Sequence, residues 1–239
     1  MKKIIDGIPL IEYFDVTKTT YAGVVFLVHG HTGNKELYGL ESLPRGFVER
    51  GYFVISIDAY KHGERKEEPY FSNDGLRYTL AMPEVVIHTI KDIIHLYNHY
   101  YKQVSPKLIV TGTSMGGHIA FQMPKYNPEV NTILPFIGSP DMKNHYEKTK
   151  GAFLQEKIAL VSKEIEELEI IDLTPYMNVN IGVFNGALDT VVEIKYVQPF
   201  IDQLIDMNHP QVHFESFECG HTVPEEMVKA MFHFFDTLR

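Results

Sequence analysis

Buried strands are the clearest signal in the pattern of apolar and polar positions along the chain. Short continuous apolar runs are typical of strands that are covered on both faces of a sheet. A partly alternating run at about 8–15 predicts an additional outer antiparallel strand, and a last strand is expected at 212–217. The continuous runs lie at 21–28, 53–57, 107–111, 132–137 and 181–184.

Amphipathic stretches between these runs predict helices. A short helix is expected at 40–50, where Gly51 ends it. Pro83 suits the first turn of a long helix that continues through Tyr101, and we interpret the preceding span, 66–79, as a surface excursion. Two further helices are expected at 194–207 and from Pro224 to the C-terminus. The apolar stripe of the long helix contains Val86, Ile90, Ile93, Ile94 and Tyr97.

Strand and helix patterns alternate along most of the chain, which predicts an α/β fold with a mostly parallel, doubly wound sheet. The 239 residues suit a single domain, 1–239. Residues 141–175 interrupt the alternation with an amphipathic helix, which we interpret as a small cap inserted over the active site. An ordinary crossover helix packed on the sheet is nearly as good an interpretation. The helix is marked by Leu154, Ile158, Val161, Ile165 and Leu168.

A glycine-flanked serine follows the 107–111 run. Gly112-Thr113-Ser114-Met115-Gly116 has the G-x-S-x-G spacing of a nucleophile elbow, in which a strand turns sharply into a helix and lifts a serine above the sheet. Glycines are needed there because a Cβ would clash in so tight a turn. The same turn aims the N–H of Met115 at the position of an oxyanion. The motif therefore predicts Ser114 as a nucleophile with half of an oxyanion hole.

A serine hydroxyl needs a base, and the base needs a third group that orients it. Asp189 lies in the loop after the 181–184 strand, and His221 lies in the loop after the last strand. Taken alone, Asp189 could cap the helix that follows it, and His221 could be an ordinary loop histidine. Their position after successive strands, in the order serine, aspartate, histidine, favours a catalytic triad. Glu218 is a rival acid, but it is almost adjacent to His221 in sequence.

The second oxyanion donor is expected in the loop after the first buried strand. His29-Gly30-His31 follows that strand, and a glycine there lets the backbone approach the site closely. We assign the donor to the backbone N–H of His31. Because the contribution comes from the backbone, replacing the side chain of His31 should cost less activity than replacing Ser114.

Composition narrows the function classes. The formal charge of −9 and the absence of a Lys/Arg cluster argue against nucleic acids and anionic membranes as partners. No secretion signal or membrane-spanning run is visible, and a single cysteine, Cys219, excludes an internal disulfide, so a cytoplasmic location is expected. His95 and His99 stand one helical turn apart, although a solvated helix face is a better interpretation of them than a metal site. No metal-binding, Walker or dinucleotide motif is present, so no metal or cofactor is expected.

Together these segments resemble the α/β-hydrolase superfamily, and within it the dienelactone hydrolase and prolyl-oligopeptidase-like esterases, with the closest likeness to small Bacillus-type carboxylesterases. The resemblance implies a cofactor-free serine esterase with a modest lid. Ser114 departs from dienelactone hydrolases proper, which use cysteine, so that particular reaction is disfavoured. The segments that carry the resemblance are His29–Glu36, Tyr60–Arg65, Gly112–Gly117, Gly138–Pro140, Gly186–Asp189 and Gly220–Pro224.

The sequence thus predicts a carboxylic ester hydrolase acting on small esters through Ser114, Asp189 and His221. We expect the substrate to be bordered by His31, Tyr60, His62 and Met115, although no specific role follows for His62. A small serine peptidase or amidase is the main alternative, and a non-catalytic ligand-binding protein of the same fold is a weaker one. A small-molecule ester is the expected partner, and the chain is expected to be a monomer or a homodimer.

Overall fold

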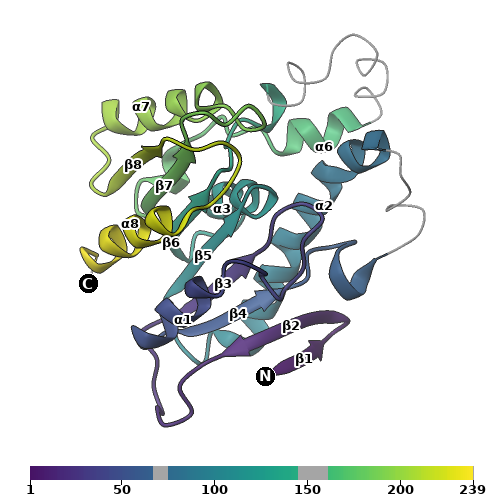
Figure 1. The fold of residues 1–239 in the computed structure, drawn as a ribbon, viewed down its shortest axis with the longest axis vertical. Helices are drawn as coiled ribbons and strands as arrows, with labels where there is room; N and C mark the ends of the chain where they lie inside the picture. The colour runs from purple at the N-terminus through teal and green to yellow at the C-terminus, as the bar shows by residue number, and fades with distance from the viewer. Residues whose placement is uncertain (67–74, 145–160, 239) are drawn as a thin grey trace.

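A twisted eight-stranded sheet forms the centre of the protein in the computed structural model, which describes residues 1–66, 75–144 and 161–238 (Figure 1). The strand order is β1-β2-β4-β3-β5-β6-β7-β8. β1 and β2 are antiparallel additions at one edge, and the other strands run parallel, as the sequence predicts for an α/β-hydrolase fold. The strands are β1 Lys2–Ile5, β2 Ile8–Tyr13, β3 Val24–Val28, β4 Phe53–Ile57, β5 Leu108–Thr113, β6 Val130–Phe136, β7 Asn180–Gly186 and β8 Val212–Phe217.

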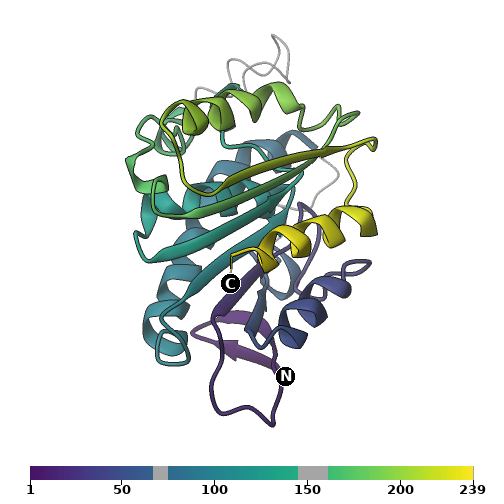
Figure 2. The same cartoon turned by 90° about the vertical axis from the view of Figure 1, so that its left-hand side faces the viewer.

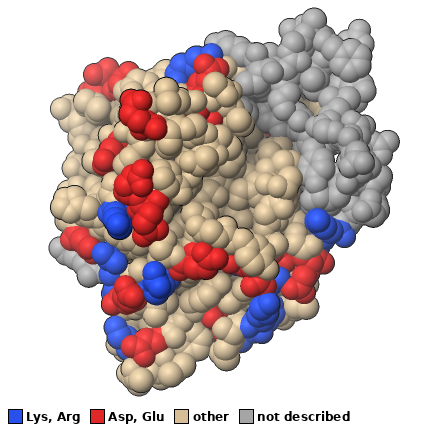
Figure 3. All heavy atoms as spheres, viewed as in Figure 1, with Lys and Arg blue, Asp and Glu red and all other residues tan. Residues whose placement is uncertain are grey.

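Helices cover both faces of the sheet (Figure 2). α1 and α8 pack on one face around Phe47 and Phe235, whereas α2, α3 and α7 pack on the other around Ile90, Ile119 and Leu204. On the face drawn in Figure 3, acidic and basic side chains are interspersed. The α-helices are α1 Ser42–Glu49, α2 Gly75–Leu96, α3 Met115–Tyr126, α6 Ser162–Glu167, α7 Gln198–Asp206 and α8 Glu225–Asp236. Shorter helical turns lie at Gly63–Arg65, Tyr97–Tyr101, Thr174–Tyr176 and Ile194–Tyr196.

Two details of the N-terminal half differ from the sequence prediction. β1 was not predicted, because its side chains are mostly exposed and give no apolar run; Asp6 and Gly7, both with positive φ, close a two-residue hairpin to β2. α2 begins at Gly75 rather than at Pro83, so 75–79 belongs to a helix and not to a surface excursion. Pro83 removes one helical hydrogen bond, but the buried residues that follow it hold the helix against the sheet.

The predicted cap lies largely outside the described residues, which leave out 145–160 and therefore Leu154 and Ile158. Within the described part, Ile165 and Leu168 are buried against α2 and α3. The single-domain boundary and the cap at 141–175 stay predictions. In the described ranges, no helix is both long and apolar enough to cross a lipid bilayer.

A buried histidine connects the ends of two parallel strands. His29 follows β3, is 3% exposed, and accepts a hydrogen bond at Nε2 from the N–H of Ala59 beyond β4 (3.1 Å). Its Nδ1–H donates to the carbonyl oxygen of Gly30 (2.7 Å). Burial lowers the pKa of His29 to about 4, because a charged imidazole would lose its hydration there. The ring is therefore neutral in the folded protein at neutral pH.

This burial predicts acid destabilisation. Between pH 6.5 and 4 the unfolded chain protonates His29 while the folded protein does not, so the free energy of unfolding falls as pH falls through that window. The contribution of this one group at pH 5 is on the order of 2 kcal/mol. Urea unfolding of the wild type and of His29→Gln at pH 7 and pH 5 measures it, with His99→Gln, at an exposed position on the Tyr97–Tyr101 helical turn, as the control. We expect a smaller pH dependence in His29→Gln alone; equal dependence in all three proteins would show that burial of His29 does not cause the acid destabilisation.

Candidate active site

The turn after β5 has the backbone of a nucleophile elbow. Ser114 adopts φ 53° and ψ −110°, a strained conformation for a residue with a side chain. A Cβ on Gly112 or Gly116 would lie 2.4 Å or 2.1 Å from the carbonyl oxygen of Val28, so glycine is required at both positions. β3 and the first turn of α3 therefore pack against each other without intervening side chains, and Ser114 projects from the carboxyl edge of the sheet.

Three side chains distant in sequence form one hydrogen-bonded chain. The Ser114 hydroxyl lies 2.8 Å from His221 Nε2, and His221 Nδ1 lies 2.7 Å from Asp189 Oδ2. With Nδ1 protonated, His221 donates to the carboxylate and leaves Nε2 free to accept the hydroxyl proton. The structure thus brings together the serine, histidine and aspartate that the sequence analysis singled out, in an arrangement suited to general-base activation of an alcohol.

Asp189 is held as an ionised group. Its second oxygen accepts hydrogen bonds from the N–H groups of Val191 (2.8 Å) and Val192 (2.9 Å), and the residue is 4% exposed. Burial alone would raise the pKa of Asp189, but the hydrogen bonds from His221, Val192 and Val191 outweigh it and lower the pKa. Both N–H donors lie in the loop ahead of the helical turn at Ile194–Tyr196, whose N-cap is Glu193, so Asp189 does not cap that turn; its carboxylate holds the loop and hydrogen-bonds to His221.

The loop after β3 also lies close to Ser114. The N–H of Gly33 donates to the carbonyl oxygen of Gly30 (3.0 Å), and Thr32 has φ 68°, which defines a type II turn with His31 and Thr32 at its centre. A Cβ on Gly30 would lie 3.6 Å from the Cβ of Ser114. The backbone at His31 therefore lies beside the elbow. Met115 directly follows Ser114 and is the first residue of α3.

Of the residues expected to border the substrate, His62 packs against this loop, whereas Tyr60 packs against α2. Tyr60 is half-buried, and its ring stacks on His88 with a centroid distance of 4.4 Å. The side chain of His62 is fully buried, and its Nδ1–H donates to the carbonyl oxygen of Tyr60 (2.9 Å). The His62 ring lies 5.3 Å from that of His31, and burial lowers the pKa of His62. A contribution of His62 to substrate binding would therefore act through His31.

His95 and His99, the two histidines one helical turn apart, lie in an exposed hydrogen-bonded group with Asp6 and Tyr100. His95 Nε2 lies 2.7 Å from Asp6 Oδ2, and Tyr100 donates its hydroxyl to the same carboxylate (2.7 Å). His99 Nδ1–H donates to the carbonyl oxygen of His95. Across the described residues, no three His, Cys, Asp or Glu side chains are arranged to hold a metal ion.

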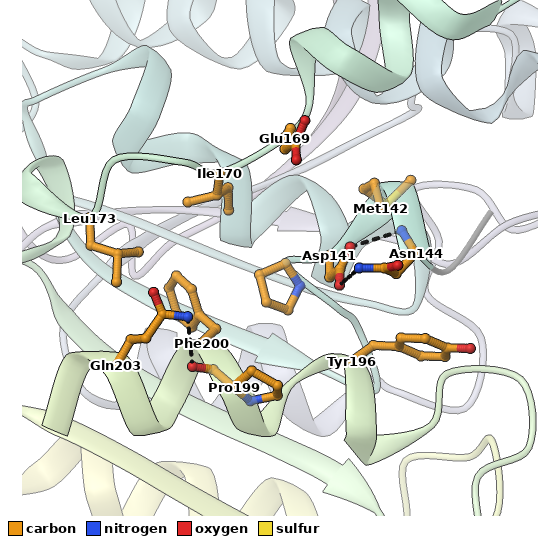
Figure 4. Close-up of a pocket in the computed structure, with 11 residues that line it drawn as sticks. Asp141, Met142, Asn144, Glu169, Ile170, Leu173, Tyr196, Pro199, Phe200 and Gln203 are labelled. Carbon is orange, nitrogen blue, oxygen red and sulfur yellow. Dashed lines mark hydrogen bonds between the residues drawn. The ribbon is translucent and has the colours of Figure 1, made fainter. Parts of the chain in front are cut away.

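A cavity of about 160 Å³ opens on the same edge of the sheet, between the loop after β6 and the start of α7 (Figure 4). Asp141 accepts hydrogen bonds from the backbone and the side-chain amide of Asn144 on one side, and Phe200 and Leu173 provide apolar walls on the other. The loop after β6 lines the cavity from Pro140 onward. In the same loop, the backbone of Gly138 packs against Gly117 in the first turn of α3.

Solved structures share this fold. TT1662 from Thermus thermophilus has a TM-score of 0.71 at 19% identity, and the alignment covers 99% of this chain and 97% of that protein. The butyrate-bound esterase Est2 from Thermogutta terrifontis has a TM-score of 0.72 at 13% identity, with 100% and 92% covered. An acylaminoacyl peptidase from Pyrococcus horikoshii has a TM-score of 0.70 at 14% identity, with 98% of this chain but only 39% of the peptidase covered. At these identities the likeness shows the α/β-hydrolase fold.

Sequence comparison gives the family. A search of curated protein sequences finds no match to this chain. The sequence model described as the dienelactone hydrolase family matches residues 13–226, which is most of the chain. The narrower likeness to Bacillus-type carboxylesterases stays a prediction. The protein is a hydrolase that belongs to the dienelactone hydrolase family.

Proposed function

We propose that this protein is a serine carboxylesterase that hydrolyses small carboxylic esters through an acyl-enzyme on Ser114. The observation that carries the proposal is the hydrogen-bonded chain from Ser114 through His221 to Asp189. Membership of the dienelactone hydrolase family and the shared fold with the Thermogutta esterase support it.

In the first half-reaction, Ser114 Oγ attacks the ester carbonyl as His221 Nε2 takes its proton. The backbone N–H groups of His31 and Met115 donate to the resulting oxyanion, while Asp189 stabilises the imidazolium. Collapse of the intermediate expels the alcohol, which receives its proton from His221. Water then attacks the acyl-enzyme through the same groups and releases the acid, so both half-reactions use only side chains and backbone of this chain.

Amide hydrolysis is the second candidate. The Pyrococcus acylaminoacyl peptidase shares the fold, although this chain spans only 39% of that longer protein. An amide needs protonation of a poorer leaving group, so the two candidates predict different rates on matched compounds. Turnover of a p-nitrophenyl ester far above that of the p-nitroanilide with the same acyl group would favour the esterase; comparable rates would favour the amidase.

Removal of the nucleophile tests the reaction class. We expect Ser114→Ala to lower kcat for p-nitrophenyl butyrate by at least about 10³-fold, because no other group would form the acyl-enzyme. Ser105→Ala is a matched control, since Ser105 lies just before the opposite end of the same strand. The assay is release of p-nitrophenolate. Retention of turnover in Ser114→Ala, or equal loss in both variants, would remove the basis of the proposal.

The backbone donor at residue 31 is tested by proline. The second position of a type II turn accepts proline, so His31→Pro should remove the N–H while keeping the turn. We expect kcat to fall by about 10²–10³-fold, the cost of losing one oxyanion donor. His31→Ala keeps the N–H and should lose less than about 10-fold. Equal effects of the two substitutions on kcat would assign the contribution to the side chain and refute the backbone role.

A further inference from the structure

A buried ion pair joins the loops that follow β3 and β4. The Nζ of Lys35 lies 2.9 Å from Asp58 Oδ2, and the side chains of the two residues are 4% and 0% exposed. The same ammonium also pairs with the carboxylate of Glu64, which is exposed to solvent. The backbone N–H of Lys35 also donates to Asp58 Oδ1 (2.8 Å), and the carbonyl oxygen of Lys35 accepts the hydroxyl of Ser56 (2.7 Å). Lys35 is therefore fixed by its side chain and by both of its backbone polar groups.

Both oxygens of the Asp58 carboxylate accept hydrogen bonds from the two loops. Its Oδ2 accepts the N–H of Glu64 (2.9 Å) as well as the ammonium of Lys35. Gly63 has φ 56°, and a Cβ there would lie 2.1 Å from Asp58 Oδ1. The loop after β4 thus closes tightly around the carboxylate.

These contacts fix both ends of the turn that contains His31. Before the turn, His29 Nε2 accepts the N–H of Ala59 (3.1 Å); after it, Lys35 binds Asp58. Both anchors lie at adjacent positions just beyond β4. The five residues between His29 and Lys35 therefore have little freedom, and Gly30 within them packs against Ser114.

We propose that Lys35 and Asp58 are positioning residues that set the place of the His31 N–H relative to the oxyanion formed at Ser114. The inference rests on the proposed esterase function. Both side chains are buried, so they act through the backbone between Gly30 and Lys35. A displacement of about 1 Å in such a donor is enough to lower a catalytic rate by about 10²-fold.

A contribution to folding stability does not by itself explain why a protein contains a buried ion pair. Removing two charges from water is costly, and replacement of both partners by neutral groups often leaves stability unchanged, whereas removal of one partner leaves an uncompensated charge. The double variant Lys35→Met with Asp58→Asn therefore separates the two roles. A purely structural pair predicts recovery of both stability and activity in the double variant; a positioning pair predicts recovery of stability only.

The experiment compares four proteins: the wild type, Lys35→Met, the Lys35→Met/Asp58→Asn double variant, and a control double variant, Arg50→Met/Asp236→Asn. The control removes another ion pair (2.7 Å), which joins the end of α1 to the end of α8. For each protein we measure the thermal midpoint, kcat and KM for p-nitrophenyl butyrate, and the Ki of an alkyl trifluoromethyl ketone. That ketone forms a hemiketal oxyanion with a serine and so reports the oxyanion hole directly. We expect the Lys35/Asp58 double variant to keep a near-native thermal midpoint. Its kcat should fall by about 10- to 100-fold, with KM within about threefold of the wild type, and the Ki of the ketone should rise by the same factor as kcat falls. The Arg50/Asp236 control should retain wild-type kcat and Ki.

Native kcat and Ki in a folded double variant would overturn the positioning role while leaving the esterase proposal intact. If the double variant does not fold, Ser56→Ala decides: it deletes only the hydroxyl that binds the carbonyl of Lys35, and it should lower kcat and weaken the ketone in parallel by about 3- to 10-fold. Unchanged kcat and Ki in Ser56→Ala would likewise overturn the inference. A wild-type protein that neither turns over the ester nor binds the ketone would instead refute the proposed function.

Discussion

Backbone hydrogen bonds that continue past the carboxyl ends of the strands determine where the functional groups lie. The N–H of Ser114 donates to Phe136 at the end of β6 (2.9 Å), and the N–H of Ile137 donates to Phe184 on β7 (2.8 Å). In the loop after β7, the N–H of Leu188 donates to the carbonyl oxygen of Cys219, just beyond β8 (3.0 Å). Ser114, Asp189 and His221 therefore stand on one continuous hydrogen-bonded edge of the sheet.

This edge also holds strained backbone. Ser114 and Ile137 both have positive φ, which is unfavourable for a residue with a side chain and especially for a β-branched one. Each such conformation costs about 1–3 kcal/mol and persists only where the surroundings enforce it. Close glycine packing surrounds both residues: a Cβ on Gly117 would lie 2.6 Å from the Phe136 carbonyl oxygen, and one on Gly138 would lie 2.6 Å from the carbonyl carbon of Gly117. The sheet thus provides the rigidity that fixes the conformation of Ser114.

Features that depend on local sequence were predictable, and features that depend on contacts between distant segments were not. The buried strands and the elbow at Ser114 follow from apolar runs and glycine spacing, and Asp189 and His221 follow from their place after successive strands. The pairing of Lys35 with Asp58 requires β3 and β4 to be neighbours, which no local pattern states; a carboxylate directly after a buried strand was the only available signal. β1 was missed because its side chains are exposed, and the start of α2 because a proline usually marks a first turn.

The proposed function requires that this edge of the sheet makes one serine, Ser114, uniquely reactive. Reaction of the native protein with a p-nitrophenyl alkylphosphonate, followed by intact mass measurement and peptide mapping, tests it most directly. We expect one phosphonyl group per chain, on Ser114, and no modification of urea-unfolded protein, because activation requires His221 and Asp189 in their folded positions. Modification of another residue, or no modification of the native protein, would contradict it.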